Sequence, residues 1–194
     1  MKNNDTLDEK NSWVYWKFNK AIDSKTCKKI IALGKGKWEN GTVKGLPDKP
    51  TRISNIYWAT DQWLYDLVFL YMTEANKRAG WNLDISGAES MQVTKYDVGS
   101  HYDYHMDGNG TGYYNRPNDK FLHNKTRKLS MSIMLNDGYE GGEFKFQDVP
   151  GQISGEGGRG DVIVFPSWQT HKVFPVKKGT RYSLVVWFLG PPLR

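Results

Sequence analysis

The sequence has few of the residues that build disulfide frameworks and membrane spans. Its 194 residues include a single cysteine, Cys27, so no disulfide can form within the chain. No apolar run approaches the roughly 20 residues of a transmembrane helix, and the polar N-terminus MKNNDTLDEKN lacks the apolar segment of a secretory signal. These absences predict a protein of the reducing cytoplasm that does not insert into membranes.

Dense basic tracts are also missing. The formal net charge is +6, but the lysines are scattered and do not alternate with stacking aromatic residues. We therefore interpret the charge as an aid to solubility and expect no nucleic-acid partner, although an acidic partner stays open. Cys27 lies in the run TCKKIIAL, where it is expected to pack as a small apolar residue and not to act as a nucleophile.

The length fits one domain, and the order of patterns predicts its architecture. We expect a flexible leader over residues 1–12 and a single domain over 13–194. Two helices are predicted, one that starts at Asp23 or Ser24 and stops at Gly34, and a longer one from Thr60 or Asp61 to Gly80. Strands are predicted at 13–18, 52–58, 90–96, 101–106, 128–135, 142–146, 161–165, 171–175 and 181–189.

Two early helices followed by many short strands indicate a mainly β (α+β) protein. The pattern fits a double-stranded β-helix, or jelly roll, with the N-terminal helices packed on one sheet. Residues 108–124 interrupt the strands with glycine, asparagine, proline and paired tyrosines. We expect this insertion to form a lid, and a disordered crossing loop is the competing possibility.

The chemistry is concentrated between Tyr96 and Asp107. His105 and Asp107 are two residues apart, and in an extended segment their side chains project to the same side. A second imidazole from His171 would complete two nitrogens and one oxygen on a single face of a metal. That 2-His-1-carboxylate set is diagnostic of non-haem Fe(II) oxygenases. Ten residues later, the planar guanidinium of Arg181 could hold a carboxylate in a bidentate manner.

The pattern Tyr96-x-x-Gly99-x-x-Tyr102-x-x-His105-x-Asp107, followed by His171 and Arg181, resembles the 2-oxoglutarate/Fe(II) dioxygenases, in particular the prolyl 4-hydroxylase-like group. The resemblance implies that Fe(II), 2-oxoglutarate and O2 are used, with ascorbate as a candidate reductant. It assigns the three metal ligands to His105, Asp107 and His171. It also implies that 2-oxoglutarate is bound by Arg181 and Tyr96, with Ser183 as a further donor.

The same resemblance implies a peptide or protein substrate that is hydroxylated on proline while 2-oxoglutarate is converted to succinate and CO2. Tyr102 and Trp187 match positions near the substrate. Arg127 could reach a substrate carboxylate or pair with Asp137 at the surface. Gly141-Gly142-Glu143 resembles a turn in which the family uses glycines with positive φ.

The sequence leaves the substrate and even catalysis itself open. Arg181 stands where collagen-type prolyl hydroxylases carry lysine, so another side chain or a free amino acid could be the substrate. The chain could also be a nucleic-acid demethylase, or a non-catalytic jelly-roll module that retains a metal. The sequence does not indicate an oligomeric state.

Overall fold

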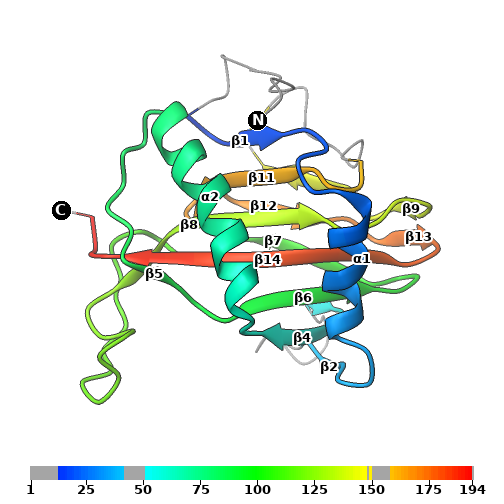
Figure 1. Cartoon of the computed structure of the whole chain (residues 1–194), viewed down its shortest axis with the longest axis horizontal. Coiled ribbons are helices and arrows are strands. Elements are labelled where there is room, and N and C mark those ends of the chain that lie inside the picture. Colours follow the sequence, from blue (N-terminus) through cyan, green and yellow to red (C-terminus); the bar gives the residue numbers. More distant parts are fainter. Residues whose placement is uncertain (1–12, 42–50, 148, 150–157, 194) are drawn as a thin grey trace.

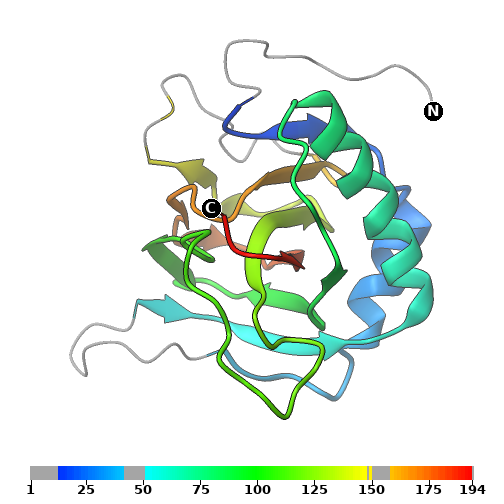
Figure 2. The same ribbon diagram turned by 90° about the vertical axis from the view of Figure 1, so that its left-hand side faces the viewer.

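The computed structural model describes residues 13–41, 51–147, 149 and 158–193. The predicted leader, residues 1–12, lies outside them. Within the described residues, two helices cover one face of a large antiparallel sheet, and a smaller sheet closes over the opposite face (Figures 1 and 2). This arrangement confirms the predicted jelly roll with its helices on one sheet.

The two helices form where the local signals place them. Helix α1 (Ser24–Leu33) begins after Asp23, whose carboxylate accepts a hydrogen bond from the Thr26 amide at 2.9 Å. Helix α2 (Gln62–Arg78) follows Asp61 and ends at Ala79, next to Gly80 with φ of 72°. Both helices turn apolar side chains, including Cys27, toward the large sheet. Neither helix combines the length and apolar character that crossing a membrane requires.

The large sheet forms one wall of the molecule. Its described strands are β1 (Trp16–Phe18), β2 (Glu39–Asn40), β4 (Asn55–Ala59), β5 (Gly87–Ala88), β6 (Met91–Tyr96), β8 (Thr126–Met134), β11 (Val162–Pro166) and β14 (Arg181–Gly190). The order is β1-β11-β8-β14-β6-β4-β2, with β5 paired to β14. Strand β14 is central, and its register places Arg181 opposite Tyr96 on β6.

The small sheet forms the opposite wall. It contains β3 (Arg52–Ile53), β7 (His101–His105), β10 (Phe144–Phe146) and β12 (His171–Val173), in the order β10-β12-β7-β3. A separate two-stranded sheet joins β9 (Glu140–Gly141) to β13 (Val176–Lys178). Gly141 and Gly142, in the predicted glycine turn, have φ of 75° and 66°, which is unfavourable for side chains with a Cβ.

Two apolar cores hold these layers together. The first lies between the helices and the large sheet. The second lies between the two sheets and contains Phe144, Phe146, Phe165 and Val173. The second core surrounds the base of the candidate site described below.

The structure corrects two parts of the sequence prediction. The single strand expected over 52–58 is broken at Ser54, where the chain passes from the small sheet to the large one. The alternation of apolar and polar residues continues through this break, so the pattern alone did not reveal it. The short strands β2, β5, β9 and β13 were not predicted, because two or three residues give too little periodicity.

Candidate active site

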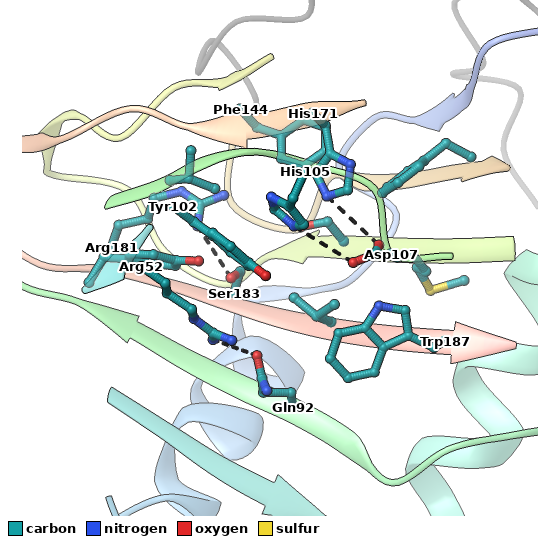
Figure 3. A pocket seen from close by; sticks show the side chains of 16 residues that line it. Arg52, Gln92, Tyr102, His105, Asp107, Phe144, His171, Arg181, Ser183 and Trp187 are labelled. Carbon is teal, nitrogen blue, oxygen red and sulfur yellow. Dashed lines mark hydrogen bonds and ion pairs between the residues drawn. The ribbon is translucent and has the colours of Figure 1, made fainter. Parts of the chain in front are cut away.

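Strand pairing brings the two histidines together. His105 ends β7 and His171 begins β12, and the two are register partners on neighbouring antiparallel strands. Their ring centroids are 4.3 Å apart. Asp107 follows two residues after His105, and its backbone N–H donates to the Ser167 carbonyl at 3.0 Å. The three predicted ligands are therefore adjacent, although they come from segments far apart in the sequence (Figure 3).

Their donor atoms converge on one point. The Nε2 atom of His105 lies 3.7 Å from Asp107 Oδ1, and the Nε2 atom of His171 lies 3.7 Å from Oδ2. One ligand atom from each of the three residues lies within 4.8 Å of the others. The Oδ2 atom of Asp107 is buried and has no hydrogen-bond partner among the described residues. A cation at this point would satisfy that atom, which fits a divalent metal held by two nitrogens and a carboxylate.

Backbone carbonyls fix the orientation of both imidazoles. The Nδ1 atom of His105 is 2.7 Å from the Asp103 carbonyl, and that of His171 is 2.9 Å from the Gln169 carbonyl. Because a carbonyl only accepts, each Nδ1 carries the proton and each Nε2 presents its lone pair to the centre. Ring contacts of His171 with Phe165, at 4.8 Å, and Phe144, at 5.2 Å, support this orientation.

The electrostatics keep His105 and Asp107 in the forms that bind a metal. Burial, together with the nearby His171, lowers the pKa of His105 to about 4, so the ring is neutral at pH 7. Burial alone would raise the pKa of Asp107. The neighbouring His171 and His105, together with the Ser130 hydroxyl and Arg127, outweigh burial, so the pKa of that carboxyl falls below its ordinary value. Metal binding needs a neutral imidazole and an ionised carboxylate, and both are present.

A buried guanidinium lies across the pocket from the metal-ligand cluster. Arg181 is 1% exposed, and its NH1 donates to the Ser183 hydroxyl at 3.2 Å. Its NH2 lies 3.5 Å from the Met134 sulfur, and the guanidinium carbon lies 5.3 Å from the centre of the Tyr96 ring. The Nε–H has no partner and no described carboxylate pairs with the group. A buried cation without an anion fits a site for a carboxylate ligand.

The residues predicted to contact substrate also line or border this pocket. Tyr102 stacks on the His105 ring with centroids 3.5 Å apart. Trp187 is 7% exposed and lies under the guanidinium of Arg127, 4.0 Å from it. The indole of Trp58 tilts against Trp187 at 6.1 Å.

Of the two possibilities left open for Arg127, the surface pairing with Asp137 is absent among the described residues. Arg127 instead donates two hydrogen bonds of 2.7 Å to the Glu89 carboxylate, and Asp137 pairs with Arg159 at 3.3 Å. Glu89 precedes β6, and its amide bonds to the Trp187 carbonyl on β14, next to the start of β8. Sheet pairing brings Glu89 to Arg127, and no local sequence signal indicates that contact.

The insertion after Asp107 is a paired hairpin. The amide of Tyr114 donates to the Lys125 carbonyl at 2.9 Å, and the amide of Asn124 donates to the Tyr114 carbonyl at 3.0 Å. The Tyr114 hydroxyl also donates to Glu89 at 2.8 Å, which ties the hairpin to the pocket wall. These bonds do not support a disordered crossing loop, and the lid stays a prediction.

A jelly roll that brings two imidazoles and a carboxylate together opposite a buried arginine has the ligand set of a mononuclear non-haem iron oxygenase. The family model of the 2OG-Fe(II) oxygenase superfamily matches residues 91–189, so the chain belongs to that family. The protein is a 2-oxoglutarate- and Fe(II)-dependent dioxygenase, and its cofactors are Fe(II), 2-oxoglutarate and O2.

Relatives agree with this assignment. A PKHD-type hydroxylase of Idiomarina loihiensis is 25% identical over 171 residues, which cover 86% of this chain and 73% of the relative. Another, from Janthinobacterium sp., is 30% identical over 114 residues, 56% of this chain and 49% of the relative. The chain thus spans about half the length of this second relative.

Solved structures share the fold. The viral collagen prolyl hydroxylase of Paramecium Bursaria Chlorella virus-1 aligns with a TM-score of 0.69 and 21% identity, over 91% of this chain and 96% of that one. A Pseudomonas putida prolyl-4-hydroxylase aligns with a TM-score of 0.66 and 21% identity, over 93% of this chain and 95% of that one. A Trichoplax adhaerens prolyl hydroxylase aligns with a TM-score of 0.70 and 18% identity, over 93% of this chain and 86% of that one.

Sequence reasoning missed three polar groups of the pocket, Arg52, Gln92 and Ser132. Arg52, on β3, lines the cavity together with Gln92 and the predicted residues. The only signal for Arg52 was the strand-like run from Arg52 to Trp58, which did not indicate where Arg52 would point. Its position depends on the break at Ser54.

Proposed function

We propose that the enzyme hydroxylates a prolyl residue of a peptide or protein, with Fe(II) held by His105, Asp107 and His171. The observation that carries this proposal is the convergence of these three side chains beside the unpaired guanidinium of Arg181. Three solved proteins of the same fold are called prolyl hydroxylases, and the Trichoplax one was solved with a peptide fragment. These likenesses support a peptide substrate here.

In this proposal each group of the pocket has a separate task. The bound metal supplies oxygen activation coupled to decarboxylation of 2-oxoglutarate, and hence hydroxylation of a C–H bond. Arg181 binds the carboxylate of 2-oxoglutarate that is distant from the metal, and Ser183 and Tyr96 donate further hydrogen bonds to it. Phe144 and Phe165 pack beside His171 and keep water away from the centre.

Three further residues are proposed to contact the substrate. Tyr102 presents its ring beside His105, where a flat apolar ring of the substrate could pack. Trp187 forms the opposite wall. Arg127 is already neutralised by Glu89, so we propose that it orients the substrate through its contact with Trp187 and does not bind a substrate carboxylate. The hairpin over 108–124 is proposed to cover the bound peptide.

The test is a product screen with the full chain, Fe(II) and 2-oxoglutarate. Proline-containing peptides, proteins and free amino acids are incubated, succinate is measured, and products are searched for a gain of about 16 Da, the mass of one oxygen atom inserted by this chemistry. We expect succinate and hydroxyproline with wild type, and neither with His105→Ala or Asp107→Ala.

His101→Ala is the matched control, because His101 lies on the same strand but outside the metal-ligand cluster. It should retain activity. Absence of succinate from wild type would refute the proposed oxygenase activity. Oxygen insertion only into another side chain, a free amino acid or a methylated nucleic acid would refute the prolyl substrate alone.

A further inference from the structure

The pocket contains a second buried guanidinium that the proposed chemistry does not use. Arg52 is 8% exposed and lies at the end of the small sheet next to Tyr102 (Figure 3). Its guanidinium carbon is 5.0 Å from the centre of the Tyr102 ring, whose other neighbour is the His105 ring at 3.5 Å. Arg52 is therefore separated from a proposed metal ligand by one aromatic ring.

Within the part of the chain that the structure describes, the hydrogen-bond partners of Arg52 are all neutral. The Nε–H donates to the Ser54 hydroxyl at 2.8 Å, and NH2 donates to the Gln92 side-chain oxygen at 2.6 Å. None of the ion pairs among the described residues includes Arg52. Removing a cation from water without an anion costs free energy, so a retained unpaired arginine indicates a ligand that supplies the negative charge.

The charges of the loaded pocket show which ligand is missing. Fe(II) and the 2-oxoglutarate dianion cancel each other, and the Asp107 carboxylate cancels the Arg181 guanidinium. Glu89 cancels Arg127 outside this set. Among the described lining residues Asp107 is the only acid, so the charge of Arg52 stays unbalanced after both known ligands are bound.

We propose that Arg52 binds a carboxylate of the substrate, so that the enzyme prefers an acceptor with a carboxylate close to the hydroxylated carbon. The inference rests on the proposed function, because the target carbon must lie near the metal. The Arg52 NH1, which has no hydrogen-bond partner among the described residues, is available for this carboxylate, and the bonds to Ser54 and Gln92 hold the planar group in place. The carboxylate could belong to an acidic side chain beside the target proline or to a C-terminal proline.

Binding measurements on wild-type protein test the preference without turnover. The full chain is loaded with Mn(II) and 2-oxoglutarate under anaerobic conditions, and peptide affinities are measured by calorimetry. One pair of end-capped peptides carries Glu or Gln beside proline. A second pair ends in proline as a free carboxylate or as an amide.

We expect at least one carboxylate peptide to bind about tenfold or more tightly than its neutral partner, as a charge-assisted hydrogen bond predicts. The pair that shows the difference identifies the source of the carboxylate. Arg52→Gln should bring the two affinities of that pair together, and Arg52→Lys should retain part of the difference. Lys28→Gln removes the same charge from an exposed site on α1 and should leave the preference intact.

Equal affinities within both pairs for wild type would overturn the proposal, as would an unchanged preference in a folded Arg52→Gln variant. A melting curve establishes that this variant is folded, and the wild-type comparison decides the question if it is not. If wild type makes succinate but shows no preference for a carboxylate peptide, the role proposed for Arg52 is refuted and the proposed function is not. Absence of succinate refutes the proposed function itself.

Discussion

At the residue scale, Arg181 is a buried cation that the fold does not neutralise. Its described contacts are a hydroxyl, a thioether and an aromatic ring, none of which carries a negative charge. Such a group costs stability in the free protein and becomes favourable when a dicarboxylate binds. Affinity for 2-oxoglutarate and stability of the free protein should therefore respond in opposite directions to its removal.

Arg181→Gln should raise the Kd for 2-oxoglutarate by about ten- to a hundredfold, because charged hydrogen bonds contribute roughly 1.5–3 kcal/mol. The melting temperature of the metal-free protein should stay constant or rise. Calorimetric titration of the Mn(II) protein and a thermal melt measure the two quantities. Lys25→Gln on α1 is the charge control. An unchanged Kd would mean that the diacid binds elsewhere.

Cys27 is the second residue whose behaviour follows from burial. Its side chain is inaccessible, and burial raises the pKa of its thiol from 9.0 to about 11. The folded protein therefore holds the thiol proton more tightly than the unfolded chain does. The stability from this difference is complete below pH 9 and is lost as the pH rises toward 11.

We expect the free energy of unfolding of wild type to fall between pH 9 and 11 by more than that of Cys27→Ala. Urea denaturation at several pH values gives this difference, and the alanine variant cancels the contribution of tyrosines and lysines. A thiol reagent at pH 8 should label wild type slowly until the chain unfolds. Equal pH dependence of the two proteins would contradict a perturbed thiol.

At the element scale, Ser167 joins three segments around the metal-ligand cluster. Its carbonyl accepts the amides of Asp107 and Gly108, both at 3.0 Å. Its hydroxyl lies 2.9 Å from that of Ser130 on β8, which is one of the groups that lower the pKa of Asp107. The turn before β12 is thereby fixed to the segment after β7.

Loss of this hydroxyl contact should weaken metal binding. Ser130→Ala should raise the Kd for Mn(II) by about tenfold, since residues that orient metal ligands typically contribute ten- to a hundredfold. Ser132→Ala is the matched control, because Ser132 is buried two residues along the same strand and has no described side-chain hydrogen bond. Equal affinities of the two variants would exclude a positioning role for Ser130.

The elements also show how far the sequence leads. His105 and Asp107 were predictable because side chains two residues apart in an extended segment project to one side, and Asp23 was predictable because a cap acts within four residues. Arg127 and Arg52 were not, because their contacts depend on which strands become neighbours. Register between distant strands is set by packing of the whole sheet, and no local pattern encodes it.

At the scale of the whole molecule, the residues proposed to bind the metal and those proposed to bind 2-oxoglutarate belong to opposite walls. His105 and His171 lie on the small sheet, whereas Arg181 lies on the central strand of the large one. Ligands that bridge such segments bind only the folded chain. Metal and 2-oxoglutarate should therefore stabilise the fold together.

Mn(II) at a hundred times its Kd should stabilise the protein by about 2.7 kcal/mol. For a chain of this size that corresponds to a rise in melting temperature of roughly 5–10 °C. Chelator should reverse the shift, and His105→Ala should show none. A similar rise in His105→Ala would mean that the metal binds at another place.

The packing of Phe144, Phe146 and Phe165 between the sheets has one more consequence. These rings set the distance between the metal-ligand cluster on one wall and the Arg181 guanidinium on the other. A dicarboxylic acid must match that separation with its own carbon chain, so homologues one methylene shorter or longer should fit poorly. Discrimination by molecular length would thus follow from the packing between the two sheets.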